Sequence, residues 1–261
     1  ISGVVLQGMF RNPLVEPYTL GISGGAALGV SLNVALKVYR SMGALSLPIS
    51  GFLGAVGTVL LVYMLSVRRG EMRLQRLLLM GVMIGFISSS AIMLIMAVSK
   101  AEDLHGIVFW IMGSLEEPHK WLIMLVLGVS LLGLVLSYLF AVDLNALSLG
   151  EEEAVHLGVN VERAKKALFL LASLLTGFSV SASGVIGFVG LVVPHFVRMF
   201  VGGDHRILLV SSYLAGSTFL ILCDTLARTI IAPLELPVGV VTGIIGGSIF
   251  IYALSKRSYE F

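Results

Sequence analysis

The stretch Asp143–Lys166 reads DLNALSLGEEEAVHLGVNVERAKK and separates two strongly apolar segments. Its three consecutive carboxylates, Glu151, Glu152 and Glu153, are too costly to place in lipid. A turn between two helices needs only a few residues, so this stretch is long enough for two short helices on the membrane surface. A membrane protein with such a charged platform typically offers it to a soluble partner.

The apolar residues of this stretch are spaced as in a short amphipathic helix that ends at Gly158. One interpretation is a docking helix that fits a groove on a cytoplasmic partner. The other is an interfacial helix that rests on lipid. The glutamates favour docking, because the cytoplasmic leaflet is itself anionic.

The rest of the 261-residue chain has the composition of a membrane protein, with 57% hydrophobic and 12% charged residues and a mean hydropathy of +1.01. Soluble domains carry about 25% charged residues, and a membrane span needs about 20 apolar residues. We therefore predict an all-α polytopic membrane protein, with one transmembrane domain over residues 1–261 and a cytoplasmic loop at 143–166. The expected apolar segments are Ile1–Phe10, Leu14–Leu36, Pro48–Val67, Leu77–Ser99, Trp121–Val142, Ala167–Ser183, Val185–Val201, Ile207–Ile230 and Leu236–Ser255.

Three smaller features complete this outline. His105–Leu115 is apolar but too short to cross a bilayer, so we expect it at the interface. The chain starts inside an apolar segment without a start methionine or a charged leader, which suggests an N-terminal truncation. The single cysteine, Cys223, excludes an internal disulfide, and a net charge of +2 suggests no nucleic-acid partner.

The basic residues of the loops give the orientation, because cytoplasmic loops carry an excess of lysine and arginine. One set of alternate loops holds Arg11, Arg68, Arg69, Arg73, Arg76, Arg163, Lys165, Lys166, Arg198, Arg206, Lys256 and Arg257. The other set holds Lys37, Arg40, Lys100, Lys120 and Arg228. The first set is therefore predicted to be cytoplasmic, together with the glutamate-rich loop and the C-terminus.

Glycine and proline mark special points in the apolar segments. Glycines spaced by three and four residues are typical of closely packed membrane helices, although a hinge or pore-lining role stays open. Pro194 removes a backbone hydrogen bond and is expected to kink or interrupt its helix. The neighbouring His195 has no second His, Cys or carboxylate three or four residues on, so we favour a structural histidine over a metal ligand or proton relay and expect no metal.

Asp224 and Arg228 lie four residues apart and therefore on one helix face. An ionisable residue in a span is a functional candidate by default. Two interpretations remain open: a local ion pair at the outer end of the span, or an Arg228 that meets an acidic partner.

Other classes of membrane protein are also weighed. An ion-coupled secondary transporter needs carboxylates near mid-membrane, and only Asp224 comes close. An intramembrane serine protease could use Ser23, in Gly21-Ile-Ser-Gly24, with His195 as base, but the motif is short in a glycine-rich chain. The chain contains no G-x-x-x-x-G-K-[ST], so any ATP-driven transport would need an ATPase on another polypeptide.

Several stretches together resemble the FecCD family, the permease subunits of type II ABC importers for ferric siderophores, haem and cobalamin. They are Leu6-Gln7 with Asn12-Pro-Leu-Val-Glu-Pro17; Gly21-Ile-Ser-Gly-Gly-Ala26; Trp110-Ile-Met-Gly-Ser-Leu115; Leu147-Ser-Leu-Gly-Glu-Glu-Glu-Ala154 with Leu157-Gly158; Gly187-Phe-Val-Gly-Leu-Val-Val-Pro-His195; Asp204-His-Arg206; and Asp224-Thr-Leu-Ala-Arg228 with Glu235-Leu-Pro-Val-Gly239. They follow the family order over nearly the whole chain. The chain departs from the family pattern where the first helix and an outer Arg-Leu-Pro-Arg motif are absent, and where Val185 replaces a frequent proline.

The resemblance implies a ten-helix permease fold, of which about nine spans are present here. It implies a homodimer in a bacterial or archaeal cytoplasmic (inner) membrane, with two ATPase subunits inside and a substrate-binding protein outside. ATP and Mg would be bound by the ATPase, and this chain would hold no cofactor. The residues expected to couple to the ATPase are Leu147, Ser148, Leu149, Gly150, Glu151, Glu152, Glu153, Ala154, Leu157, Gly158 and Val161. Arg228 is expected to face an acidic residue of the binding protein.

A wide pathway for a large substrate is expected to be lined by weakly polar residues. The serines that we assign to it are Ser88, Ser89, Ser90, Ser181 and Ser183. The expected substrate is a ferric siderophore, haem or cobalamin, with an oxyanion such as molybdate as a further possibility within the family.

Overall fold

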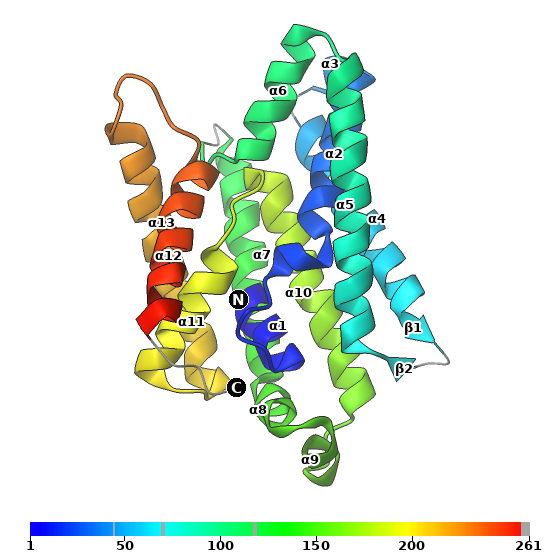
Figure 1. Ribbon diagram of the computed structural model, residues 1–261, viewed down its shortest axis with the longest axis vertical. Coiled ribbons are helices and arrows are strands. Elements are labelled where there is room, and N and C mark those ends of the chain that lie inside the picture. The colour runs from blue at the N-terminus through cyan, green and yellow to red at the C-terminus, as the bar shows by residue number, and fades with distance from the viewer. Residues whose placement is uncertain (44, 69–70, 117–118, 257–261) are drawn as a thin grey trace.

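The computed structural model describes residues 1–43, 45–68, 71–116 and 119–256, and nearly all of them are helical (Figure 1). In chain order the helices are α1 (Ser2–Phe10), the 3₁₀ helix η1 (Pro17–Leu20), α2 (Ile22–Ala35), α3 (Val38–Met42), α4 (Ser46–Ser66), α5 (Leu74–Val98), α6 (Ala101–Met112), α7 (Lys120–Leu139), α8 (Ala141–Leu149), α9 (Glu151–His156), α10 (Val161–Ser183), α11 (Val189–Val201), α12 (His205–Thr229) and α13 (Val238–Lys256). Two short strands, β1 (Val67–Arg68) and β2 (Glu71–Met72), pair antiparallel between α4 and α5. The sequence analysis did not predict this hairpin.

Each of the nine predicted apolar segments contains a helix, and together they form the all-α membrane fold. Five helices of the described chain are long and apolar enough to cross a bilayer alone: α4, α5, α7, α10 and α12. Helices α2 and α11 and the stretch Val238–Tyr252 are apolar but shorter. Many large apolar side chains point outward, as in a protein whose surroundings are lipid or other helices.

The connections predicted to be cytoplasmic lie together at one end of the molecule. The β1–β2 hairpin, α8 and α9 share the lower end in Figure 1, whereas α3 and the start of α6 lie at the upper end. This separation agrees with the orientation derived from the basic loops. Arg69 and Arg257, which entered that derivation, lie outside the described residues.

The predicted close packing of glycine-rich helices is visible where α2 crosses α4. A Cβ atom on Gly54 would collide with the carbonyl oxygen of Gly25, and one on Gly25 would lie 2.7 Å from the carbonyl oxygen of Gly54. Backbones can approach this closely only where both residues lack a side chain. These two glycines therefore serve packing.

Two predicted spans are shorter than expected because their first residues are not α-helical. In Leu14–Leu36 the helix α2 starts only at Ile22, after η1 and after Gly21, whose φ of +74° is left-handed. In Val185–Val201 the helix α11 starts at Val189, after Phe188 with φ +68°. Non-helical backbone inside a membrane protein needs polar partners, and the first of these segments supplies them to the second.

The partners come from η1 and the residue before it. The Tyr18 hydroxyl donates to the carbonyl oxygen of Ile186 and accepts from the Ile186 N–H at 2.9 Å. Glu16 Oε1 accepts from the Phe188 N–H at 2.8 Å. The two breaks therefore lie side by side, and side chains of the first satisfy backbone groups of the second.

Helix α11 continues through Pro194 and is not interrupted there. Pro194 has no N–H, so the carbonyl oxygen of Gly190 loses the donor that a regular helix would provide. Gln7 of α1 replaces it: its Nε2 donates to the Gly190 oxygen at 3.2 Å and to the Leu191 oxygen at 3.4 Å. The predicted kink at Pro194 stays a prediction, but its missing hydrogen bond is made good by a side chain from another helix.

Helix α6 is more than an isolated surface segment. It starts at Ala101, four residues before the predicted His105–Leu115, and packs against α2. Its Ile107 side chain is fully buried. Beyond its end, the Ser114 N–H donates to the carbonyl oxygen of Ser183 at 2.8 Å, which joins this segment to the end of α10.

Candidate functional site at the cytoplasmic end

Helices α8 and α9 form the lower end of the molecule, which the loop charges predict to be cytoplasmic, and we call residues 141–160 the cytoplasmic platform (Figure 1). The two short helices that the sequence predicted are present, although α8 starts at Ala141, inside a segment predicted to be a span. Gly150 separates them with φ +146°, a conformation that favours glycine. The last residues of the predicted loop, Val161–Lys166, are already the first turns of α10.

The residues predicted to couple to an ATPase divide into a buried and an exposed set. Leu147, Gly150, Ala154 and Val161 are buried and hold the platform against the helices above it. Ser148, Leu149, Glu151, Glu152, Glu153, Leu157 and Gly158 are exposed.

The exposed apolar side chains of the platform share its acidic surroundings. Leu149, Val155 and Leu157 are 61%, 59% and 64% exposed. They stand beside Glu152 and Glu153, for which the described residues offer no ion-pair partner. Apolar groups framed by charge at the water-facing end of a membrane protein are typical of a protein-docking surface.

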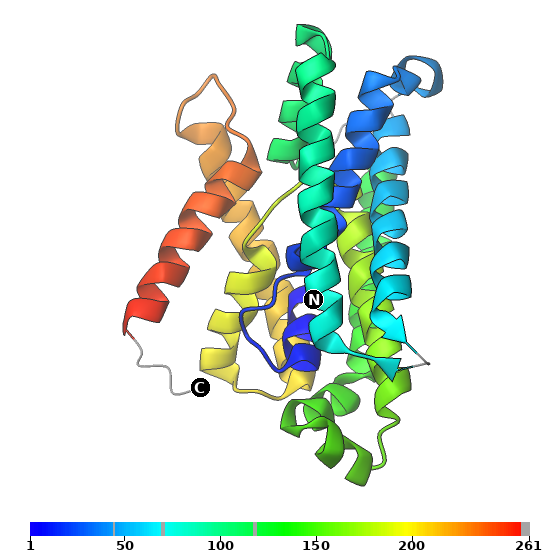
Figure 2. The same cartoon turned by 45° about the vertical axis from the view of Figure 1, so that its right-hand side comes forward.

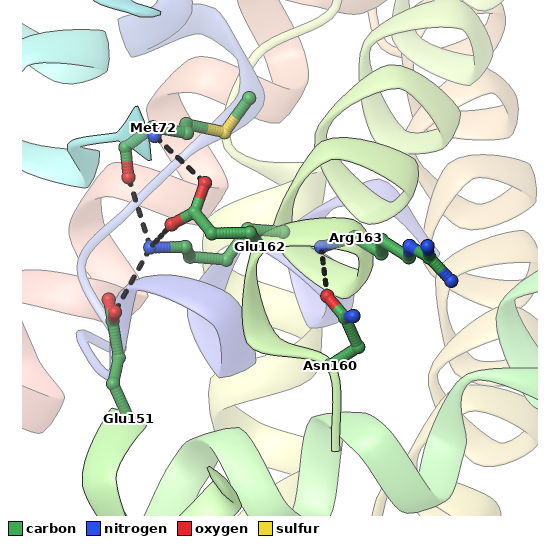
Figure 3. A network of polar contacts seen from close by, with 6 residues as sticks. Met72, Glu151, Asn160, Glu162 and Arg163 are labelled. Atoms are coloured by element: carbon green, nitrogen blue, oxygen red, sulfur yellow. Dashed lines mark hydrogen bonds and ion pairs between the residues drawn. The ribbon is translucent and has the colours of Figure 1, made fainter. Parts of the chain in front are cut away.

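Glu151 has a different role from its two neighbours, because its carboxylate pairs with Lys165 of α10; Figure 3 shows Glu151 pointing toward Glu162 and Met72, which share this contact. The Lys165 Nζ lies 3.0 Å from Glu151 Oε2 and 2.7 Å from Glu162 Oε1, and it donates to the Met72 carbonyl oxygen at 3.0 Å. Glu162 Oε2 in turn accepts from the Met72 N–H at 3.0 Å. We call this set of contacts the lysine joint; it connects α9, α10 and β2.

The lysine joint compensates the buried charge of Lys165 with polar partners. The Lys165 side chain is only 3% exposed, and its three donors meet two carboxylates and a carbonyl. A buried ammonium is tolerated only when it is paired and hydrogen-bonded in this way. In the same turn Asn160 Oδ1 accepts from the Arg163 N–H at 3.1 Å and caps α10, while the Arg163 side chain points away from the joint (Figure 3).

A second joint connects α8 to the first turn of α12. Asn145 Nδ2 donates to Asp204 Oδ1 at 2.8 Å, and Asn145 Oδ1 accepts from the His205 N–H at 2.9 Å. His205 Nδ1 lies 2.7 Å from the same Asn145 oxygen, which places its proton on Nδ1. Asp204 also caps α12 by accepting from the Arg206 N–H at 3.0 Å. We call these contacts the asparagine joint.

At the opposite end, Arg228 is held by carboxylates of its own chain. Its Nε lies 3.0 Å from Asp224 Oδ2, and its Nη1 lies 3.7 Å from Glu235 Oε1. The side chain is 37% exposed. The local ion pair that the sequence suggested is therefore present, and Arg228 remains accessible to a partner.

The five serines assigned to a pathway lie in different surroundings. Ser88 and Ser181 are buried, next to Gly24 of α2 and Gly51 of α4 respectively. Ser89 lines a cleft of about 490 Å³ between α2, α5 and α6. Ser183 lines a cleft of about 280 Å³ between α1, α7, α10, α11 and α12. Ser90 is exposed on α5. The chain alone does not gather them into one channel.

The residues proposed for a protease also lie apart. Ser23 lines the cleft between α2, α5 and α6. His195 is buried on α11, with its ring centroid 5.6 Å from that of Phe250 of α13 in an edge-on arrangement. This aromatic packing fits the structural histidine that the sequence favoured.

Comparison with known proteins decides between the remaining classes. A family model described as the FecCD transport family matches residues 1–256. The chain belongs to the FecCD transport family. It is accordingly a permease subunit of an ABC transporter and not itself a catalyst.

Several FecCD proteins with similar sequences are named after the compound that they transport. The hemin transport system permease protein HmuU of Yersinia pestis is 42% identical over 260 residues, covering 98% of this chain and 77% of that protein. The cobalamin import system permease protein BtuC of Halobacterium salinarum is 38% identical, covering 98% and 68%. The Fe(3+) dicitrate transport system permease protein FecD of Escherichia coli is also 38% identical, covering 98% and 79%.

A solved structure supports the same fold for this FecCD chain. A metal-chelate type ABC transporter in an inward-facing conformation superposes with a TM-score of 0.90 at 35% identity. The match covers 98% of this chain and 80% of the other. The family resemblance and the permease fold predicted from the sequence are thereby confirmed.

Sequence reasoning missed the side chains that hold the site together. Gln7, Glu16, Tyr18, Asn145 and Lys165 each bond to a residue far away in the chain. A partial signal existed for Lys165, which follows Glu162 by three residues on one helix face. The others are polar residues in or beside apolar segments, a pattern that indicates a buried partner without naming it.

Proposed function

We propose that this permease carries an iron chelate, such as a ferric siderophore or haem, or cobalamin across the cytoplasmic membrane. In this proposal a binding protein delivers the substrate at the outer face, and ATPase subunits dock on the cytoplasmic platform. The similar permeases that are named for the transport of hemin, cobalamin and Fe(3+) dicitrate support this substrate class.

The observation that carries the proposal is the exposed face of the platform. It presents Leu149, Val155 and Leu157 beside Glu152 and Glu153, while the buried face is fixed by two polar joints. An apolar surface with a rigid support and a charged rim suits a soluble partner better than an anionic leaflet.

A second copy of this chain is part of the proposal. The two clefts described above measure about 280 and 490 Å³, at the small end of ligand pockets, which range from about 300 to 1,000 Å³. A haem-sized or larger substrate is better accommodated in a pathway shared between two copies. Arg228 is our candidate contact for the binding protein, because its guanidinium is oriented by Asp224 and still partly exposed.

The experiment is recovery of the ATPase with the tagged permease from its native membranes in mild detergent. Glu152→Lys/Glu153→Lys should lose most of the ATPase, because the charge of the docking rim is reversed. Glu151 is left unchanged, because it pairs with Lys165 and a lysine at this position would place two ammonium groups side by side. Glu102→Lys, at the outer end, is the matched control and should retain the ATPase.

Two results would overturn the proposal. One is a wild-type chain that brings down no ATPase. The other is an ATPase that remains bound, with normal uptake of hemin or cobalamin by the cells, when both glutamates are reversed. Uptake is measured with each of these two compounds in turn, so that the substrate class is tested separately from docking.

A further inference from the structure

Platform helices α8 and α9 are joined to different membrane helices. Helix α9 reaches α10 and the β1–β2 hairpin through the lysine joint, and α8 reaches α12 through the asparagine joint. We propose that Lys165 and Asn145 are positioning residues that divide one movement of the platform into two: Lys165 carries it to the start of α5, and Asn145 carries it to the start of α12. This inference rests on the proposed function, because the movement is the one that the ATPase would impose.

The lysine joint reaches α5 through one residue of the hairpin. Both backbone polar groups of Met72 are held, the N–H by Glu162 and the carbonyl oxygen by Lys165. Its side chain is also 1% exposed and therefore fixed in the core. Helix α5 starts at Leu74, two residues beyond Met72. A displacement of α9 that pulls Glu151 therefore acts on Lys165, then on Met72, and then on the first turn of α5.

The asparagine joint is a direct grip on the start of α12. The first N–H groups of a helix have no partner within the helix. Here Asn145 accepts one of them, from His205, and simultaneously orients Asp204, which accepts from Arg206. Tilting α8 therefore moves the acceptors that hold the first turn of α12.

The two target helices lie on opposite sides of the molecule. In Figure 1 α12 and α13 stand on one side and α2, α4 and α5 on the other, with α1 between them; Figure 2 again shows α12 and α13 apart from α2 and α4. Each packed helix shifts as a rigid rod that slides or tilts against its neighbours rather than deforming continuously. A platform attached to one side alone would move only that side, and two joints allow both sides to respond to one docking event.

The test measures nucleotide-dependent distances by electron spin resonance on the complex with its ATPase, in lipid nanodiscs. Cys223, the single cysteine, is buried and is replaced by alanine in every sample. Spin-label pairs join exposed Leu36, at the outer end of α2, to Gln75 at the start of α5 or to Ile207 at the start of α12. Both pairs should change their distance between the nucleotide-free state and the state trapped with ATP and vanadate.

The two joints predict a crossed result. Lys165→Met should remove most of the shift at Gln75 and leave the shift at Ile207, whereas Asn145→Ala should do the reverse. Glu151→Gln is a second route to the lysine joint, because this half-exposed carboxylate can be changed without a charge vacancy in the core. Arg163→Met, which removes a positive charge in the same turn outside the joint, should leave both shifts intact.

A general loss of stability would reduce both shifts together, so the crossed pattern separates positioning from folding. The inference is overturned if each variant keeps both shifts, if each variant loses both equally, or if the wild-type complex shows no shift at all. A wild-type chain that recovers no ATPase refutes the proposed function instead, and that result is seen before any label is attached.

Discussion

The lysine joint and the asparagine joint fasten the same platform to two membrane helices, but in different surroundings. Lys165 is 3% exposed and carries a full charge into the packed interior, where two carboxylates and a carbonyl surround it. Asn145 uses a neutral amide at the water-facing surface, where it meets the exposed Asp204. Water can replace a lost partner at the exposed Asp204, but not at the buried Lys165. The comparison teaches that two similar connections should differ greatly in how much stability is lost when each is removed.

The largest effect is expected from Lys165→Glu. The change places a third carboxylate against Glu151 and Glu162 and leaves the Met72 carbonyl without its donor. Breaking a buried ion pair from one side costs about 3–5 kcal/mol. We expect a strongly lowered thermal midpoint of the purified protein in detergent, measured by loss of the monodisperse peak after heating.

The control for this change lies two residues away on the same helix. Arg163→Glu makes the same change of charge on an exposed side chain that points away from the joint. Exposed substitutions usually stay within about 0.5 kcal/mol. Equal destabilisation by the two variants would show that net charge near the platform, rather than the buried joint, determines stability.

Gln7→Leu tests whether burial alone, without charge, makes a joint expensive to lose. The Gln7 amide is 1% exposed and supplies the hydrogen bond that Pro194 cannot give to the Gly190 oxygen. An unpaired buried carbonyl costs about 1–3 kcal/mol. The thermal midpoint of Gln7→Leu should therefore fall measurably, but by less than that of Lys165→Glu.

A double-mutant cycle identifies the cause of that loss. In a Pro194→Ala background residue 194 regains its N–H and can itself donate to the Gly190 oxygen. Gln7→Leu should then cost much less than in the wild type. An equal cost in both backgrounds would mean that Gln7 acts through packing and not through the hydrogen bond.

Long-range joints are also where the sequence stops being informative. The spans and the platform could be predicted, because continuous apolar runs and a block of carboxylates are local signals. Gln7 and Gly190 are 183 residues apart, and Met72 and Lys165 are 93 residues apart. No periodicity in one sequence pairs such residues, so their contacts had to come from the structure.

The predicted starts of two spans were wrong for a related reason. Residues 185–188 are as apolar as a span, so hydropathy predicted that the span starts at Val185, whereas α11 starts at Val189. What interrupts the helix is the left-handed backbone at Gly184 and Phe188, supported by Glu16 and Tyr18 from another segment. Glycine marked one of these positions, but the supporting acceptor and hydroxyl were visible only once the two segments were seen together.

Asn145→Ala should have a smaller effect on stability than either buried change. It removes a neutral donor and acceptor from the start of α12. The exposed Asp204 can then bond to water, whereas the N–H and the ring of the buried His205 lose their acceptor. A typical hydrogen bond contributes about 0.5–1.5 kcal/mol.

Ser148→Ala is the matched control on the same helix, because its hydroxyl bonds only the Asn145 carbonyl oxygen among the contacts of the described residues. A loss for Asn145→Ala as large as for Gln7→Leu would contradict the distinction between exposed and buried joints.

The smallest effect is expected from the charge of Asp204, and it can be measured as a function of pH. The Asn145 amide and the Arg206 N–H both donate to this carboxylate, and they lower its pKa below the usual value. Because the folded-state pKa is the lower one, the contribution to stability is fully present above the ordinary aspartate pKa of about 3.9 and is lost as the pH falls through the folded-state value.

Asp204→Asn keeps an acceptor and a good helix cap but has no charge to titrate. The wild type should therefore be slightly more stable than Asp204→Asn at neutral pH, and the difference should vanish in acid. A difference that is independent of pH would show that the asparagine joint depends on geometry alone, and its contrast with the charged lysine joint would then be complete.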